Sequence, residues 1–126
     1  MTVIIEAMAA GVTYPRARRA AVVEIDLAIH AGESVGIVGE SGSGKTTLCR
    51  LLVGTLGPTQ GRILVRGREW TSVRRRDQVR REVQMVFQDP YSALNPWLTA
   101  RQAVAEVFRA WDSIPRHESE ERADQV

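Results

Sequence analysis

A glycine-rich loop followed by one lysine and two threonines is the stretch of this sequence best suited to chemistry. Residues 39–46 read Gly-Glu-Ser-Gly-Ser-Gly-Lys-Thr and match the pattern G-x-x-x-x-G-K-[S/T]. Glycines let a backbone turn sharply and approach an anion, and successive N–H groups then form a concave nest. Lys45 adds a charge that can reach β and γ phosphates, and the Thr46 hydroxyl can ligate Mg²⁺. The loop is therefore predicted to bind phosphate, with Ser41 and Ser43 acting through their backbone N–H groups.

The elements on either side of this loop support that prediction. Residues 34–38 (SVGIV) form a short apolar run that indicates a buried strand. After the loop, Leu48, Leu51 and Leu52 recur at helical spacing, and the Gly- and Pro-containing residues 57–61 are expected to end that helix. A helix that starts here would aim its positive N-terminus at the same point as the loop.

Two other interpretations of the loop are less favoured. The first is a flexible, Gly/Ser-rich surface turn, which the strand and helix on either side argue against. The second is a dinucleotide-binding fingerprint, of which Gly42 and Gly44 supply the first two glycines. The third glycine position is occupied by Thr47, which is too large for the close helix–strand contact required there.

The remaining sequence predicts an α/β domain. Further strands are expected at residues 3–8, 22–29, 62–65 and 83–87, with Val23, Ile25, Leu27 and Ile29 on one face of the second. Between the first two lies a short loop with Tyr14, Pro15 and three arginines, Arg16, Arg18 and Arg19. A short helix or loop is expected at 72–81, an irregular segment at 88–97, an amphipathic helix at 99–111 opened by Thr99, and possible helix beyond it.

Composition excludes several classes of protein. The 126 residues suffice for one modest domain, and 17 Lys and Arg against 15 Asp and Glu give a net charge of only +2. Such a balance does not by itself indicate nucleic acid or an anionic membrane as partner. A single cysteine excludes a disulfide framework. The N-terminus does not resemble a signal peptide, and no stretch approaches the ~20 apolar residues of a membrane span.

A second motif narrows the choice among phosphate-binding families. Residues 84–96 read QMVFQDPYSALNP, and together with GESGSGKTT they closely resemble the ATP-binding subunits of ABC transporters, in particular the oligopeptide, dipeptide and nickel importer branch. The resemblance covers residues 1–112. It implies a P-loop NTPase-type sheet with an antiparallel β portion and the start of a helical subdomain, an incomplete domain. Residues 1–97 would be the N-terminal part of the nucleotide-binding domain, and residues 98–126 would begin the helical subdomain.

The resemblance also implies roles for individual residues, with ATP and Mg²⁺ as cofactors. Tyr14 resembles the aromatic residue that stacks on adenine; the alternative is an ordinary half-buried residue at a strand end. Gln88 resembles the glutamine that approaches Mg²⁺ and the attacking water; the alternative is a solvated loop residue. Thr47 is expected to bond the α-phosphate. The predicted site comprises Tyr14, Gly39, Ser41, Gly42, Ser43, Gly44, Lys45, Thr46, Thr47 and Gln88, with Thr46 and Gln88 also ligating the metal.

By the same resemblance, the protein would be a transport ATPase that acts with other chains. It would pair with a second ATP-binding subunit and contact transmembrane permease subunits through the Gln88 region, with a substrate-binding protein as an indirect partner and no nucleic acid. It would lie in the cytoplasm on the inner face of the cell membrane. ATP binding and hydrolysis would power transport of a small solute such as a peptide or nickel.

Several parts that this family needs for hydrolysis have no match in the sequence. No apolar strand ends in Asp-Glu, no L-S-G-G-Q signature occurs, and no switch histidine is present. We therefore expect the N-terminal part of a longer protein, and predict that the chain alone is marginally folded, binds ATP weakly and is inactive. Without a neighbouring strand, residues 34–38 would present an unpaired edge. Two alternatives remain: a catalytically inactive truncated remnant, and a small kinase, which should carry an Arg-rich lid in place of the glutamine segment.

Overall fold

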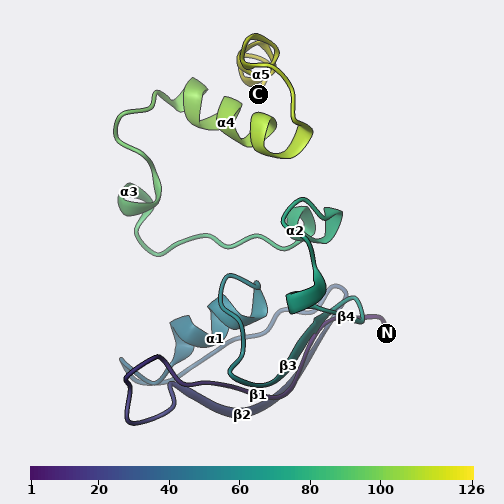
Figure 1. The fold of residues 1–126 in the computed structure, drawn as a ribbon, viewed down its shortest axis with the longest axis vertical. Coiled ribbons are helices and arrows are strands. Elements are labelled where there is room, and N and C mark those ends of the chain that lie inside the picture. Colours follow the sequence, from purple (N-terminus) through teal and green to yellow (C-terminus); the bar gives the residue numbers. More distant parts are fainter. The chain divides into compact units, whose positions relative to one another are not determined.

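The computed structural model describes residues 1–126, except for the side chains of Pro90 and Ser92. The chain forms two compact units, Met1–Gln84 and Met85–Val126. Figure 1 shows the strands and the first helices in the first unit, and three further helices in the second. The phosphate-loop sequence lies in the first unit and Gln88 lies in the second.

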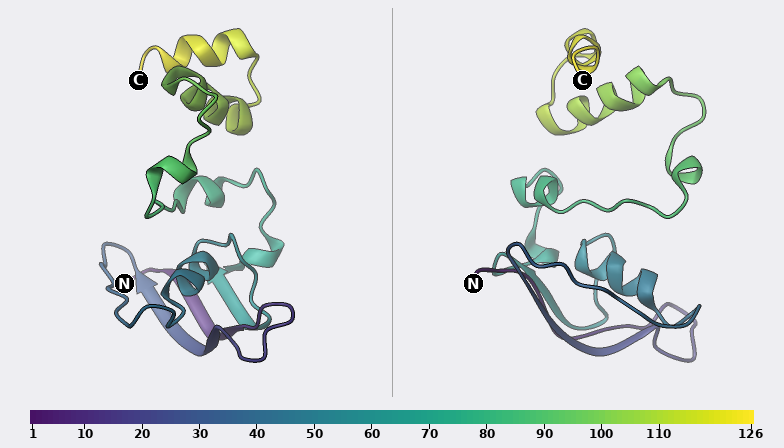
Figure 2. Two further views of the ribbon diagram at one scale, coloured as in Figure 1. Left: turned by 90° about the vertical axis from the view of Figure 1, so that its left-hand side faces the viewer. Right: turned by 180° about the vertical axis from the view of Figure 1, so that it is seen from behind.

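The first unit is built on a four-stranded antiparallel sheet of order β2-β1-β3-β4. Its strands are β1 (Val3–Val12), β2 (Val22–His30), β3 (Gln60–Val65) and β4 (Arg68–Glu69). Strands β1, β2 and β3 confirm three predicted strands, whose β-branched and other apolar residues suit a pleated, half-buried sheet, and β1 continues beyond the predicted residues 3–8 to Val12. Figure 2 shows the long β1 and β2 curving together beneath the first helix.

At the start of strand β2, the side chain that faces the core differs from the prediction. Ile25, Leu27 and Ile29 pack on the core as expected, but Val23 is 61% exposed and Val22 is buried in its place. The reason is an irregularity: Glu24 has a φ of 43°, and the pairing of β1 with β2 shifts register between Ala10 and Val12. A bulge of this kind adds a residue to one strand and reverses which side chains face inward.

Helix α1 (Lys45–Leu52) packs on the sheet and confirms the helix predicted after the loop. Leu51 and Leu52 are buried, and Leu48 packs partly buried against both clusters of the core. The helix ends earlier than residues 57–61, because Gly54 takes a left-handed φ of 71° directly after the last turn. Left-handed glycine is the common way to end an α-helix.

Trp70 connects the far end of α1 to the rest of the sheet. It lies in the short 3₁₀ helix η1 (Trp70–Ser72), is buried, and donates its indole N–H to the carbonyl of Leu52 at 2.9 Å. Arg80, in helix α2 (Gln78–Glu82), places its guanidinium 5.1 Å from the centre of the Trp70 ring. The indole therefore satisfies a helix-end carbonyl and packs against a cation at the same time.

Two predicted strands, residues 34–38 and 83–87, are not strands in the structure. Neither segment pairs with a strand of the described chain, so their backbone groups have no ladder to complete. Val38 and Val86 are each 96% exposed, whereas Ile37 and Val83 are half-buried against the core. At 34–38 the sequence predicted a buried strand with one unpaired edge, and this prediction was wrong: no strand forms, Val35 and Val38 are exposed, and Ile37 is half-buried against the core.

The second unit contains helices α3 (Pro90–Ala93), α4 (Ala100–Asp112) and α5 (Arg116–Ala123). The short α3 interrupts the segment 88–97, which was predicted to be irregular throughout. Helix α4 confirms the amphipathic helix, and Thr99 caps it: the Thr99 hydroxyl accepts from the Gln102 N–H, and the Gln102 side chain accepts from the Thr99 N–H at 2.9 Å. Helix α5 packs on α4.

Ion pairs hold α4 and α5 together. Arg101 reaches from α4 to both oxygens of Asp124 at 2.6 and 2.7 Å, and also to Glu120 at 3.3 Å. Arg122 pairs with Asp112 at 3.2 Å. The guanidinium of Arg101 lowers the pKa of the Asp124 carboxyl, because two hydrogen bonds favour its charged form.

Replacing Gly54 with alanine should destabilise the first unit. A Cβ at this position would lie 2.5 Å from the Trp70 ring, and the φ of 71° is unfavourable for any side chain. We expect a loss of about 3 kcal/mol in the free energy of unfolding, from strain and overpacking together, measured by urea unfolding followed by tryptophan fluorescence. The control is Gly67→Ala, which has a φ of 74° but nothing within 4 Å of its Cβ, and should lose only about 1 kcal/mol. Equal losses in the two variants would contradict the packing role of Trp70.

The contact between α4 and α5 should weaken in acid. The pKa of Asp124 is lowered in the folded chain, so its ion pair stabilises the helices above the ordinary carboxyl pKa, and this contribution is lost as pH falls through the lowered value. The expected transition lies below about pH 4. NMR amide shifts of the buried Ser119, followed from pH 6 to pH 2, would measure it.

Asp124→Asn should weaken the helix pair at pH 7 and leave a smaller acid transition. Glu121→Gln removes the same charge from α5 at a carboxylate that enters no ion pair among those described, and serves as the matched control. If both variants titrated like the parent chain, the Arg101–Asp124 pair would not contribute to this contact.

Candidate functional site

The loop of residues 39–44 turns sharply into α1, and its glycines carry the turn. Gly42 and Gly44 have φ values of 80° and 94°, in the left-handed region that favours glycine. The Ser43 N–H donates to the Glu40 carbonyl at 3.2 Å and closes one turn of the loop. A Cβ on Gly42 would meet nothing within 4 Å, so one side of the loop is open to solvent or to a ligand.

The N-terminus of α1 has free backbone N–H groups that can bind an anion. The helix begins at Lys45 with Gly44 as its N-cap, no side chain caps it, and its first turn contains no acidic residue. The first N–H groups of an α-helix have no partner within the helix and carry its positive partial charge. An uncapped end at the exit of a glycine loop is therefore a site where phosphate oxygens can accept several hydrogen bonds.

Lys45 folds its side chain back over the loop. Its ammonium group donates to the carbonyl of Gly39 at 2.7 Å and to that of Glu40 at 2.5 Å. Two neutral carbonyls satisfy donors of the ammonium without neutralising its charge. The positive charge is thus held next to the uncapped helix end, where an anion can exchange for these carbonyls.

Two contacts bring the β1–β2 loop, residues 13–21, against this site. The Tyr14 hydroxyl lies 3.1 Å from the Thr47 hydroxyl, in hydrogen-bond contact, and Tyr14 is 37% exposed. A Cβ on Gly44 would come 2.3 Å from the carbonyl oxygen of Ala21, so only glycine allows the two backbones to approach. The structure therefore brings Tyr14 and Thr47, both predicted site residues, to the first turn of α1.

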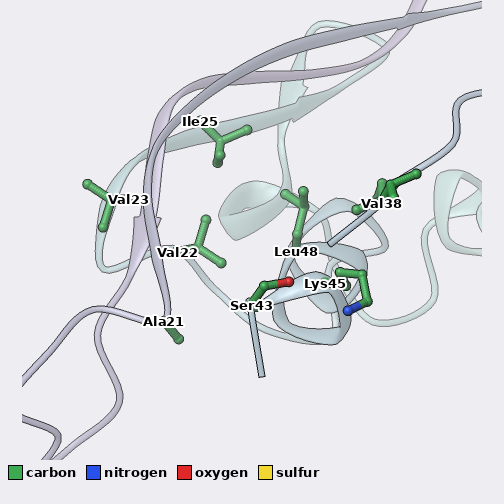
Figure 3. A pocket seen from close by; sticks show the side chains of 10 residues that line it. Ala21, Val22, Val23, Ile25, Val38, Ser43, Lys45 and Leu48 are labelled. Atoms are coloured by element: carbon green, nitrogen blue, oxygen red, sulfur yellow. The ribbon is translucent and has the colours of Figure 1, made fainter. Parts of the chain in front are cut away.

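A pocket of about 360 Å³ lies between β2 and the start of α1. Figure 3 shows Val22 and Ile25 of β2 on the side toward Leu48 of α1, with Val23 on the other side of the strand. Lys45 lines the pocket at the start of α1. Ile37 and Val38, from the segment before the loop, complete its apolar wall. The lining is mostly hydrocarbon, so the evidence for phosphate binding comes from the loop and helix end and not from this pocket.

The predicted site residues fall into two groups. Nine of them lie in the first unit around the start of α1, and these are Tyr14, Gly39, Ser41, Gly42, Ser43, Gly44, Lys45, Thr46 and Thr47. The hydroxyl-bearing side chains of Ser41, Ser43 and Thr46 are exposed. Gln88 is exposed in the second unit, just before α3, and its approach to the metal stays a prediction.

Sequence reasoning missed the part played by Ala21. Ala21 contributes its backbone carbonyl, which lies against Gly44, and a backbone contact cannot be predicted from the type of side chain. Sequence reasoning also missed the hydrogen bond between Tyr14 and Thr47, because two residues 33 positions apart in the sequence do not reveal that the loop folds back. The one signal in the sequence is the glycine at position 44 of the motif, because glycine allows both a positive φ and the close approach of another backbone.

Comparison with known proteins assigns the family. The family model of the ABC transporters matches residues 22–126, and the chain therefore belongs to the ABC transporter family. A probable peptide ABC transporter ATP-binding protein, y4tS of Sinorhizobium fredii, is 45% identical over 105 residues, which are 82% of this chain and 30% of the relative. The nickel import ATP-binding protein NikE of Escherichia coli is 43% identical over 104 residues, 81% of this chain and 39% of the relative.

The oligopeptide transport ATP-binding protein OppF of Lactococcus lactis gives a similar result. It is 39% identical over 104 residues, which are 81% of this chain and 33% of the relative. The chain thus spans 30–39% of the length of these three curated relatives. The predicted resemblance to the peptide and nickel importer branch is confirmed.

Solved structures show the same fold. The ATP-binding cassette MJ0796, described as a dimer in a post-hydrolysis state bound to ADP and Pi, superimposes with a TM-score of 0.71 at 25% identity, covering 97% of this chain and 55% of that one. The protein cbiO1 from Clostridium perfringens, part of the transporter complex cbiONQ, gives a TM-score of 0.67 at 26% identity, covering 99% and 49%. The predicted cassette fold, with an antiparallel β portion and an incomplete domain, is confirmed. In the described part of the chain, no helix combines the length and apolar character needed to cross a bilayer.

The hydrogen bond between Tyr14 and Thr47 should be measurable as a coupling. In a double-mutant cycle of Tyr14→Phe and Thr47→Val, we expect a coupling of about 0.5–1 kcal/mol in the free energy of unfolding, because the bond is partly exposed. Urea unfolding of the four variants measures it. The matched control replaces Thr47→Val with Thr46→Val, one residue earlier in the helix, where the coupling should vanish. Equal couplings in the two cycles would mean that the contact has no net effect on stability.

Proposed function

We propose that this chain is the nucleotide-binding part of an ATP-binding subunit that powers transport of a small solute across a membrane. The observation that carries the proposal is the first turn of α1, which is uncapped, free of acidic residues and next to the ammonium of Lys45. This arrangement suits the phosphates of ATP. The names of the relatives, which are peptide and nickel transport ATP-binding proteins, support the class of solute.

The residues present fit ATP and Mg²⁺. The open face of Gly42 and the N–H groups at the start of α1 would hold the phosphates, and Lys45 would exchange its carbonyl partners for phosphate oxygens. The exposed Thr46 hydroxyl would ligate Mg²⁺, with Gln88 as a further ligand. Bound Mg²⁺ would neutralise charge that develops on the phosphates. Tyr14 would present its ring to adenine while its hydroxyl is held by Thr47.

The partners would be permease subunits, a second ATP-binding subunit and, indirectly, a substrate-binding protein. The segment after Gln88 supports a protein partner there, because Tyr91, Leu94 and Trp97 are 90%, 62% and 90% exposed. A cytoplasmic position at the inner face of the membrane follows from the proposed partners. We also propose that the family's subdomains divide after residue 97, with residues 98–126 beginning the helical subdomain.

A second candidate function is that these 126 residues bind nucleotide without hydrolysing it. The sequence lacks the acidic strand end and the signature motif, and the apolar segments at 34–38 and 83–87 have no strand partner among the described residues. The two candidates share the phosphate site and differ in turnover. Release of phosphate from ATP by the chain alone would contradict the prediction that it is inactive.

Lys45→Ala should abolish most of the affinity for ATP. It removes the ammonium beside the helix end, and we expect the dissociation constant for Mg-ATP to rise at least about tenfold, measured by isothermal titration calorimetry. Gln88→Ala should leave binding within about twofold, because its predicted role is in turnover. If both variants lost affinity equally, Gln88 would be a binding residue and its assignment would be wrong.

The control for charge is Arg50→Ala. Arg50 is an exposed cation in the last turn of the same helix, so this variant removes one positive charge away from the phosphate loop. We expect its affinity for Mg-ATP to match that of the parent chain within about twofold. An equal loss in Arg50→Ala and Lys45→Ala would show that net charge alone governs binding, and the proposed site would be wrong.

A further inference from the structure

Three arginines in the β1–β2 loop have no role in the proposed function. Arg16, Arg18 and Arg19 are exposed, and none enters an ion pair or a side-chain hydrogen bond among those described. No acidic residue occurs between Glu6 and Glu24, so the loop carries three uncompensated positive charges. An exposed cluster of one sign within a nearly neutral chain produces a local field that the net charge of +2 does not reveal.

Both ends of this loop are attached to the phosphate site. Tyr14 contacts Thr47 at 3.1 Å, and the Ala21 carbonyl lies against Gly44. Consecutive Cα atoms are 3.8 Å apart, so the Cα of Arg16 lies within about 7.6 Å of that of Tyr14, and the Cα of Arg19 within about 7.6 Å of that of Ala21. The two contacts therefore keep the backbone of the arginines near the phosphate site, and we expect their field, with a screening length of ~8 Å at physiological salt, to reach the mouth of that site.

Figure 1 shows this loop at the end of the sheet where α1 begins, and the right-hand view of Figure 2 shows the same juxtaposition from behind. The segment 74–76, which carries three more exposed arginines, lies next to α2 at the other end of the first unit. Two clusters of equal formal charge therefore differ in their distance from the phosphate loop.

The backbone of Arg16 is an independent observation. The Ala17 N–H donates to the Tyr14 carbonyl at 3.0 Å and closes a turn with Pro15 and Arg16 at its centre. Arg16 has a φ of 68°, as the third residue of a type II turn requires, and glycine or asparagine normally takes that place. An arginine there costs about 1 kcal/mol or more in backbone energy, and strained positions of this kind cluster at functional sites.

Charges close to the loop do not cancel the field of the cluster. Within residues 39–48, which comprise the phosphate loop and the start of α1, Glu40 is the only acidic residue and Lys45 balances its charge. On β2, Asp26 accepts a hydrogen bond from the Ala9 N–H at 2.8 Å, and the exposed Glu24 lies three residues after Ala21. Glu24 and Glu40 together supply two negative charges against the four positive charges of Lys45 and the three loop arginines. The mouth of the site is therefore positive.

We infer that Arg16, Arg18 and Arg19 attract the nucleoside triphosphate to the phosphate loop and raise its rate of association. The inference rests on the proposed nucleotide-binding function and goes further, because it assigns a kinetic role to residues outside the phosphate-binding motif. Long-range attraction of an anionic ligand acts on the association rate and is screened by salt, whereas a direct contact acts mainly on dissociation. The cluster thus determines how fast nucleotide enters and not how long it stays.

The test is stopped-flow binding of an N-methylanthraniloyl derivative of Mg-ATP to the 126-residue chain at two salt concentrations. The variant Arg16→Gln/Arg18→Gln/Arg19→Gln should associate roughly five- to tenfold more slowly at 20 mM salt, with a dissociation rate within about twofold of the parent chain. At 500 mM salt the difference in association rate should shrink below about twofold, because screening shortens the range of the field. The control, Arg74→Gln/Arg75→Gln/Arg76→Gln, removes the same formal charge from the other end of the unit and should change association by less than about twofold.

Other results would overturn either the proposed nucleotide-binding function or the role inferred for the loop arginines. If the parent chain does not bind the probe, the proposed nucleotide-binding function fails, and the inference fails with it. If the parent binds and the loop variant associates as fast as the parent, only the inference is wrong. Equal slowing in both triple variants would show an effect of net charge and not of position, and a change confined to dissociation would show direct contact; either result overturns the inference.

A single-site variant separates the charge from the strained backbone. Arg16→Gly removes one charge and also the unfavourable φ, so we expect an equal or higher melting temperature together with slower association at low salt. A lower melting temperature would mean that Arg16 is retained for stability, which would overturn its assignment to steering.

Discussion

The close approach of two backbones at Gly44 is the contact on which the rest of the site depends. Gly44 is at once the last residue of the phosphate loop, the N-cap of α1 and the neighbour of the Ala21 carbonyl. Its φ of 94° and the 2.3 Å that a Cβ would leave both exclude any side chain. One glycine therefore aims the positive end of the helix, forms the loop and holds the β1–β2 loop beside it. Tyr14 comes within reach of Thr47 because that loop is held there.

The opposite end of α1 is fixed by different means. Gly54 reverses the chain, Trp70 closes over it, and the indole N–H satisfies the Leu52 carbonyl. Arg80 then stacks on the indole and donates to the Val73 carbonyl, connecting α2 to the same point. A short helix of eight residues is marginal by itself, and its order comes from packing and from these two anchored ends. These two ends therefore fix where the first turn of α1, and with it the phosphate loop, lies.

Exposed apolar segments are the reason why we expect the first unit to be only marginally folded. Residues 34–38 lead directly into the phosphate loop, yet Val38 is 96% exposed and no described strand pairs with the segment. An extended apolar segment with free backbone groups is a template for pairing with another chain. The pocket between β2 and α1, walled by Ile37 and Val38, is part of the same uncovered surface. The phosphate loop needs a fixed backbone on its N-terminal side, but residues 34–38, which lead into it, pair with no strand in the described part of the chain.

The sequence alone determined the phosphate loop, the helix after it, three strands of the sheet and the capped helix α4, because each depends on short-range patterns of glycine, periodicity and capping side chains. It also determined the family, since two motifs separated by some forty residues were both specific.

Sequence reasoning failed where hydrogen bonds between distant segments decide the outcome. Residues 34–38 and 83–87 have strand-like composition, but a strand exists only when another strand completes its ladder. It placed Val23 on the wrong face because the bulge at Glu24 is set by pairing with β1. Only the tertiary structure showed that the Tyr14 hydroxyl contacts Thr47 and that the Ala21 carbonyl lies against Gly44. Both contacts depend on how a loop folds back in space, which residue types and local spacing do not specify.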